Sequence, residues 1–129
     1  MIERLYYYDM PKVAPMNATE IVIQASCIKR VETQFRARMI AVPNGTYIAS
    51  SAGRGKANRE GRSKGFPDCI IYGLGPNAGK VAFTEIKARS VLKPEQDACL
   101  TTMALNGHDC GVFRSQDTLA DWLTERGWK

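Results

Sequence analysis

Two short apolar segments joined by a turn-rich connection constrain the fold of this chain more than any other feature. Residues 69–72 read CIIY, which is typical of a brief buried strand, and residues 80–87 (KVAFTEIK) alternate as a second strand. The connection between them, residues 73–79, contains three glycines, a proline and an asparagine, all of which are common in turns. The pattern therefore predicts an antiparallel hairpin.

A helix is predicted before this hairpin, from about Ala18 to Met39. Asn17 is a suitable N-cap residue, and Glu20 stands three residues later in the capping-box position. A short strand over residues 40–42 and a turn over residues 43–45 follow this helix. The apolar stripe of the helix consists of Ile21, Ala25, Ile28, Val31, Phe35 and Met39.

Two further helices and one strand are predicted after the hairpin. The first of these helices starts at Pro94 and stops near Gly107, and residues 110–113 (CGVF) form the strand. Ser115 caps the final helix, which Gly127 closes. The order helix, three strands, helix, strand, helix predicts an α/β (α+β) fold in which helices flank a mixed sheet. Because 129 residues is an ordinary length for one domain, we expect residues 1–129 to form a single domain.

Some classes of protein are excluded by composition. No apolar run approaches the roughly 20 residues that cross a bilayer, and the N-terminal residues lack the apolar stretch of a signal peptide. We therefore expect a cytoplasmic protein without a membrane partner. The four cysteines are scattered, with no C-x-x-C pair, and the chain has one histidine. This spacing predicts buried, reduced thiols and no zinc site.

The chain is moderately basic, with a net charge of +5 and an isoelectric point of about 9.2, which favours an anionic partner. Positive charge is concentrated in residues 54–64, which read RGKANREGRSK and contain one acid. Such a segment is either a solvated surface loop or a phosphate-binding loop, and the residues after it favour the second. Its cationic residues are Arg54, Lys56, Arg59, Arg62 and Lys64.

The residues that suggest chemistry are Asp68, before the first strand of the hairpin, and Glu85 and Lys87 in the second. Glu85 and Lys87 lie two residues apart in an extended segment, so their side chains share one face, roughly 6–7 Å apart. Pairing of the strands would bring Asp68 towards Glu85 on that face. Two converging carboxylates, with the Ile86 carbonyl as a further ligand, suit Mg²⁺ or Mn²⁺.

A lysine beside such a metal site has a defined role in phosphodiester hydrolysis. The reaction needs a positioned nucleophilic water and neutralised charge on the phosphate. A divalent cation supplies both effects, and Lys87 can bind the water or the attacked phosphate oxygen.

Each of these residues also has an ordinary structural interpretation. Glu85 and Lys87 can be a solvent-facing pair, and Asp68 after a proline can start a turn. Val81 and Phe83 share the face of Glu85, however, so this face is expected to be partly buried. Buried charges need partners or a metal, which favours the functional interpretation.

Two segments, GFPDCIIY and VAFTEIKAR, resemble the P-D…(D/E)-x-K motif of the restriction-endonuclease-like, PD-(D/E)xK, superfamily. More specifically, the chain is similar to the virus-type replication-repair nuclease (VRR-NUC) domain, which occurs alone in phages and bacteria and fused to larger repair nucleases in eukaryotes. The similarity includes TEIVIQ, VPNG, GRSKGFPD, EIK, PEQ and the closing segment GHDCGVFRSQDTLADWL. The leader Tyr6–Tyr8 and the segment Tyr47–Asn58 match no part of this pattern. The leader either packs at a subunit interface or covers a sheet edge.

The resemblance implies a role for each candidate residue. Asp68 and Glu85 would be the principal metal ligands, with Lys87 as the catalytic lysine. Glu20 would complete the metal site directly or through water. Gln96 would help to position water or DNA, the alternative being an exposed glutamine in a first helical turn. Phosphate contacts, which position DNA without reading sequence, would come from Arg54, Lys56, Arg59, Arg62 and Lys64.

The expected function is that of a Mg²⁺- or Mn²⁺-dependent DNA endonuclease in replication, repair or recombination. Family members that act alone resemble four-way-junction (Holliday junction) resolvases and are thought to dimerise, which implies a homodimer acting on branched DNA. The alternatives are a restriction-like nuclease that cuts ordinary duplex DNA and a DNA-binding module that reads DNA structure without cutting. RNA binding is disfavoured because aromatic residues make up 9% of the chain and none interleaves with the basic segment.

Overall fold

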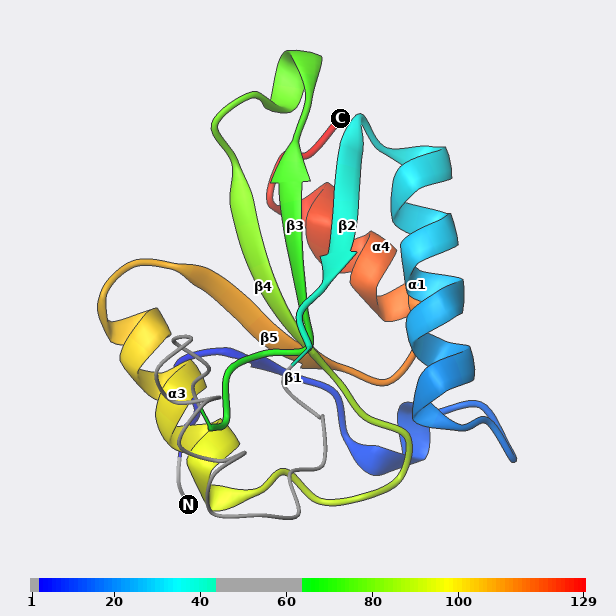
Figure 1. The fold of residues 1–129 in the computed structure, drawn as a ribbon, viewed down its shortest axis with the longest axis vertical. Coiled ribbons are helices and arrows are strands. Elements are labelled where there is room, and N and C mark those ends of the chain that lie inside the picture. Colours follow the sequence, from blue (N-terminus) through cyan, green and yellow to red (C-terminus); the bar gives the residue numbers. More distant parts are fainter. Residues whose placement is uncertain (1–2, 44–63) are drawn as a thin grey trace, which may run out of the picture.

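Five strands in the described residues, 3–43 and 64–129, form one mixed sheet in the computed structural model (Figure 1). The strand order is β1-β5-β4-β3-β2. β1, β5 and β4 run parallel to one another, whereas β3 is antiparallel to both β4 and β2. The strands are β1 (Tyr7–Tyr8), β2 (Ala37–Ala41), β3 (Cys69–Gly73), β4 (Val81–Ile86) and β5 (Asp109–Phe113).

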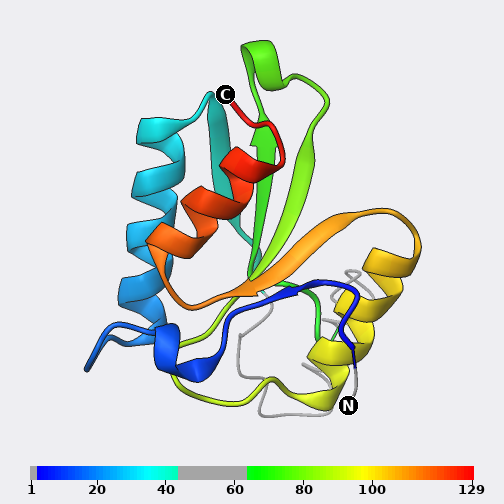
Figure 2. The same cartoon turned by 180° about the vertical axis from the view of Figure 1, so that it is seen from behind.

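Helices cover both faces of this sheet, as predicted. α1 (Glu20–Gln34) and α4 (Gln116–Glu125) pack together on one face, and α3 (Pro94–Leu105) lies against β5 on the other (Figures 1 and 2). Two short 3₁₀ helices, η1 (Pro11–Val13) and η2 (Gly75–Asn77), lie in connections. The larger core cluster lies between the sheet and α1 and α4, and the smaller one lies under α3.

The central hairpin is confirmed. β3 and β4 pair in antiparallel register, with Cys69 opposite Thr84 and Ile70 opposite Phe83. The starts of α3 at Pro94 and of α4 after the N-cap Ser115 also agree with the sequence, since the Ser115 hydroxyl accepts a hydrogen bond from the Asp117 N–H at 3.1 Å.

The prediction for the first helix is wrong at both ends. The N-cap residue is Thr19, whose hydroxyl accepts from the Val22 N–H, so Glu20 is the first helical residue and not a capping-box partner. The helix stops at Gln34, and the segment expected to be its last turn is instead β2, which is also longer than the predicted strand.

The predicted apolar stripe of this helix is wrong at Ile21 and Ala25, which are exposed, and right at Val31, which is buried. Met39 is buried as a residue of β2, where side chains alternate every second position, and not as part of the helix. The buried residues of α1 are Ile23, Cys27 and Val31, whereas Ile21 is 83% exposed.

The aromatic leader covers a sheet edge, one of the two interpretations left open by the sequence. Tyr7 and Tyr8 form β1, which pairs with β5. The Tyr7 ring stacks on Phe113 with centroids 5.0 Å apart, and the Tyr6 hydroxyl donates to Asp97 Oδ1 at 2.6 Å. A strand of two residues has too little periodicity to be predicted from sequence.

The thiols of Cys27, Cys69 and Cys110 are free and buried, as predicted, and that of Cys99 is half-buried. Burial raises the pKa of Cys69 to about 12 and that of Cys110 to about 11. The described part of the chain contains no helix long and apolar enough to cross a membrane. The segment Tyr47–Asn58 lies outside the described residues.

Candidate active site

The register of the hairpin brings Asp68 and Glu85 together. Cys69 pairs with Thr84 in the antiparallel ladder, so the next position along places Asp68 opposite Glu85. Two hydrogen bonds hold Asp68 in this position, one through its side chain and one through its main chain. Its Oδ2 accepts from the Ile86 N–H at 2.9 Å, and its main-chain carbonyl accepts from the Val42 N–H at 2.7 Å.

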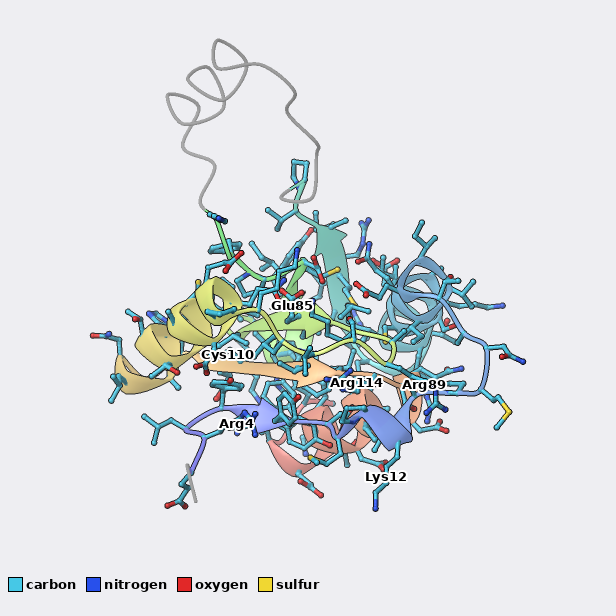
Figure 3. The ribbon with its side chains drawn as sticks, turned by 90° about the horizontal axis from the view of Figure 1, so that it is seen from below. Arg4, Lys12, Glu85, Arg89, Cys110 and Arg114 are labelled. Atoms are coloured by element: carbon cyan, nitrogen blue, oxygen red, sulfur yellow. The ribbon has the colours of Figure 1, made fainter. Side chains whose placement is uncertain are left out.

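Glu85 and Lys87 are buried at the end of β4, with side chains only 2% and 5% exposed. They lie on the face of β4 that carries Phe83, which packs in the cluster under α3. The alternate residues Ala82 and Ile86 point into the core beneath α1 and α4. The solvent-facing interpretation of Glu85 and Lys87 is therefore wrong. Figure 3 labels Glu85 on β4, beside α3.

The surroundings of Glu85 favour its protonated form. Burial, and after it the neighbouring Asp68 carboxyl, together raise the pKa of Glu85 to about 9. The positive charge of Lys87 opposes this shift, and the more distant Glu20 adds to it slightly. Asp68 and Glu85 thus form a closely interacting acid pair, with a cationic side chain on the same strand.

Gln96 joins the acid pair to the start of α3. Its Nε2 donates to Glu85 Oε2 at 3.1 Å, while its Oε1 accepts from the Lys93 N–H at 2.9 Å. The second bond satisfies a main-chain N–H at the beginning of the helix. Gln96 is therefore held from both ends of its amide, and it is not simply an exposed first-turn residue.

Glu20 lies beside the acid pair but is not part of its hydrogen-bond network as described. Glu20 is exposed at the first turn of α1, and its Oε2 accepts from the Ser90 hydroxyl at 3.3 Å. Ser90 belongs to the segment that follows β4 just after Lys87. Sequence reasoning missed this contact, because a serine in a loop gives no signal of its partner.

The donor set at the acid pair fits a divalent cation. Glu85 Oε1 is buried and has no hydrogen-bond partner among the described residues, which is costly for a carboxyl oxygen. Hard cations such as Mg²⁺ and Mn²⁺ bind carboxylate oxygens of this kind. In residues 3–43 and 64–129, no group of three or more His, Cys, Asp or Glu side chains is arranged to hold a metal. The fit therefore depends on Asp68 and Glu85.

The segment leading to Asp68 runs against the first turn of α3. Gly65 has a φ of +86°, and a Cβ at this position would lie 2.3 Å from the Glu95 carbonyl oxygen and 3.1 Å from the Gln96 nitrogen. Lys64 Nζ lies 3.9 Å from Glu95 Oε1, with the lysine side chain 84% exposed. Only glycine allows this close approach of two backbones.

Lys64 is the one predicted phosphate-binding residue within the described part of the chain, and it lies near the acid pair along the sequence. The others lie outside the described residues: Arg54, Lys56, Arg59 and Arg62. The described residues thus bring together Asp68, Glu85, Lys87 and Gln96, with Glu20 at the margin.

Comparisons of the chain with known proteins found no relative. No model of a protein family, no curated protein and no solved structure matches the chain.

Proposed function

We propose that this chain is a divalent-metal-dependent nuclease that hydrolyses phosphodiester bonds in DNA, on a restriction-endonuclease-like core of the virus-type replication-repair kind. The observation that carries the proposal is the acid pair formed by the half-buried Asp68 and the buried Glu85, with Lys87 buried directly after the same strand. If Lys87 served only in a structural ion pair, one carboxylate would be enough to balance its charge, whereas two are present. A second carboxyl in contact with the first is costly without a cation.

Asp68 and Glu85 would hold Mg²⁺ or Mn²⁺, with the Ile86 carbonyl and Glu20 as further oxygen ligands, Glu20 either directly or through water. When bound, the metal would supply Lewis-acid chemistry, polarising the phosphate and lowering the pKa of a water molecule. The buried Lys87 ammonium would stabilise the negative charge that develops on the attacked phosphate.

Two other residues keep this arrangement in place. The Gln96 amide fixes Glu85 Oε2, leaving Oε1 free of protein hydrogen bonds among the described residues. The Ile86 N–H fixes Asp68 Oδ2. Each acid therefore has one oxygen held by a protein N–H, which is a form of preorganisation.

We propose branched DNA, such as a four-way junction, as the substrate, with two copies of the chain acting as a homodimer. The support is the resemblance in sequence and the basic segment before Asp68. Paired cuts across a junction require two active sites in one complex. The alternatives are cutting of linear duplex and binding without cutting.

Purified protein incubated with labelled four-way junction, flap, single-stranded and linear duplex DNA tests these possibilities. We expect cleavage with Mg²⁺ or Mn²⁺, none with EDTA, and the highest rate on branched DNA. Asp68→Asn and Lys87→Ala should each lower the rate at least 100-fold, on the order of what loss of one charge-stabilising group costs.

The matched controls are Asp121→Asn and Lys29→Ala, which change the same residue types at exposed positions on α4 and α1. Sedimentation of the same samples gives the number of chains per complex. Cleavage that survives Asp68→Asn and Lys87→Ala would rule out the site, and tight binding without cleavage under every metal condition would favour the non-cutting module.

A further inference from the structure

Arg114 is a fully buried arginine at the end of β5, with 0% of its surface exposed. Its guanidinium donates four hydrogen bonds. Three acceptors are main-chain carbonyl oxygens: Asp9 at 2.7 Å, Ala88 at 2.7 Å and Ser90 at 2.8 Å. The fourth is the Tyr8 hydroxyl at 3.0 Å. A buried cation is tolerated only when its donors are satisfied in this way.

Two of these carbonyls belong to the turn that follows the catalytic strand. Ala88 comes directly after Lys87, and the guanidinium bridges the carbonyls on both sides of Arg89. The Arg89 side chain donates to the Ala14 carbonyl at 2.9 Å. Figure 3 labels Arg114 and Arg89 in the same region, beyond the end of β5. The main chain of residues 88–90 is therefore held by hydrogen bonds from the buried Arg114 guanidinium.

The same turn reaches the margin of the site. The Ser90 hydroxyl donates to Glu20 Oε2 at 3.3 Å. On the other side, the Lys87 N–H donates to the Phe113 carbonyl, directly before Arg114. Arg114 therefore directly follows Phe113, whose carbonyl binds the Lys87 N–H. It also binds the carbonyl of Ser90, whose hydroxyl contacts Glu20.

We propose that Arg114 is a positioning residue, which fixes the turn of residues 88–90 and so holds Lys87 and Glu20 in place around the acid pair. This inference rests on the proposed nuclease function. Arginine is required because its planar fork presents donors in several fixed directions. A lysine ammonium has three donors on a single nitrogen and cannot reach all four acceptors.

Limited trypsin digestion tests whether the turn is held. Cleavage after Arg89 requires the turn to open, and its rate follows the population of the open form. In Arg114→Lys we expect cleavage after Arg89 to accelerate at least tenfold. Cleavage after Arg30 in α1 should change less than twofold, because it requires wider unfolding.

Cleavage after Lys12, which follows β1, separates the proposal from a merely structural role. If Arg114 only ties β1 to the sheet through Tyr8 and Asp9, cleavage after Lys12 accelerates and cleavage after Arg89 does not. That result, or an equal acceleration at all three sites, would overturn the proposal. Fragments are identified by mass spectrometry.

Kinetics on the best DNA substrate provide the second readout. Arg114→Lys should lower kcat at least tenfold while KM changes less than twofold, because the turn orders Lys87 and Glu20 without contacting DNA. An open turn with an unchanged kcat would contradict positioning. If Arg114→Lys does not fold, Tyr8→Phe, which removes one of the four acceptors, should still accelerate cleavage after Arg89 about twofold. An unchanged rate there would overturn the proposal.

The two proposals can fail separately. Lys87→Ala should lower the rate of DNA cleavage at least 100-fold without changing the trypsin rates after Lys12, Arg30 and Arg89. If the wild-type protein neither cuts DNA nor binds Mn²⁺ in a calorimetric titration, the nuclease function fails, and the catalytic part of the Arg114 proposal fails with it. The trypsin rates would then still decide whether Arg114 holds the turn.

Discussion

Glu85 lies in surroundings that oppose its ionisation, and this has a consequence for stability. In the unfolded chain its carboxyl loses a proton near pH 4.5, but in the folded protein only near pH 9. Between these values the folded state binds more protons than the unfolded state. Without metal, stability should therefore fall as the pH rises from 5 to 9, with a slope of at most about 1.4 kcal/mol per pH unit from this group.

Thermal unfolding in EDTA at several pH values measures this slope. Glu85→Gln should flatten it, because an amide does not titrate, and should raise the Tm most at pH 8–9. Mg²⁺ should raise the Tm of the wild-type protein at pH 8 and leave that of Glu85→Gln nearly unchanged. The exposed Glu125→Gln is the control. A wild-type slope that persists in Glu85→Gln would assign the pH dependence to another group.

Gln96 performs two tasks that substitutions can separate. Gln96→Glu keeps an oxygen for the Lys93 N–H but replaces the amide that donates to Glu85. With Mg²⁺ present, its Tm should stay close to that of the wild type, while kcat falls about tenfold or more. Gln96→Ala loses both contacts, so it should also lose about 0.5–2 kcal/mol of stability, as for other capping residues. Wild-type kcat in Gln96→Glu would show that the bond to Glu85 is dispensable.

The segment that leads to Asp68 packs through Gly65 against the first turn of α3, which carries Gln96. An alanine at position 65 would have a strained φ and would clash with the Glu95 carbonyl. Gly65→Ala should therefore cost about 2–5 kcal/mol, combining positive-φ strain with overpacking, and should lower kcat in the molecules that remain folded.

Gly79→Ala is the matched control for this change. Gly79 has nearly the same φ, +87°, but no atom within 4 Å of an added Cβ. Its cost should be only the backbone strain, about 1–2 kcal/mol, with kcat unchanged. Denaturant unfolding and cleavage kinetics on the same samples check both values. Equal losses in the two variants would mean that the contact with α3 contributes nothing.

Elements with a strong local pattern were predictable from sequence, and those that depend on distant contacts were not. The hairpin and the start of α3 follow from alternation, turn residues and a proline. The boundary between α1 and β2 was misplaced because apolar residues in both segments fit a helical period by chance. β1 was missed because its two residues are a strand only through pairing with β5.

The site divides in the same way. The proximity of Asp68, Glu85 and Lys87 was predictable, because it follows from strand spacing and from the pairing of the hairpin. The two contacts of Gln96 were not predicted. The burial of Arg114 was not predicted either, since nothing in CGVFR shows that the arginine points inwards. Burial of a charged residue is decided by the chain that surrounds it, not by its neighbours in sequence.

At the scale of the whole molecule, the net charge of +5 predicts that the proposed binding of DNA depends on salt. The double variant Arg62→Ala, Lys64→Ala should weaken binding equally for DNA of different sequence. It should also make the dependence of log Kd on log salt shallower by about 2, since each phosphate contact contributes about 0.9.

The control for this prediction is Lys12→Ala, Lys29→Ala, which removes the same charge from exposed positions on η1 and α1. It should change the slope by less than half as much. Fluorescence anisotropy at 50–300 mM salt gives both slopes. A change in sequence preference in the first double variant would contradict simple phosphate contact.

The two hydrogen bonds of Gln96 also limit how this position can evolve. A mutation to most other residues would weaken the start of α3 and release Glu85 in a single step, so selection on stability and selection on chemistry act on one side chain. Glutamate is the exception, since it keeps the helix contact, and its codons differ from those of glutamine by one nucleotide. If the proposed chemistry holds, a single nucleotide change at position 96 therefore gives a less active but well-folded descendant of this chain.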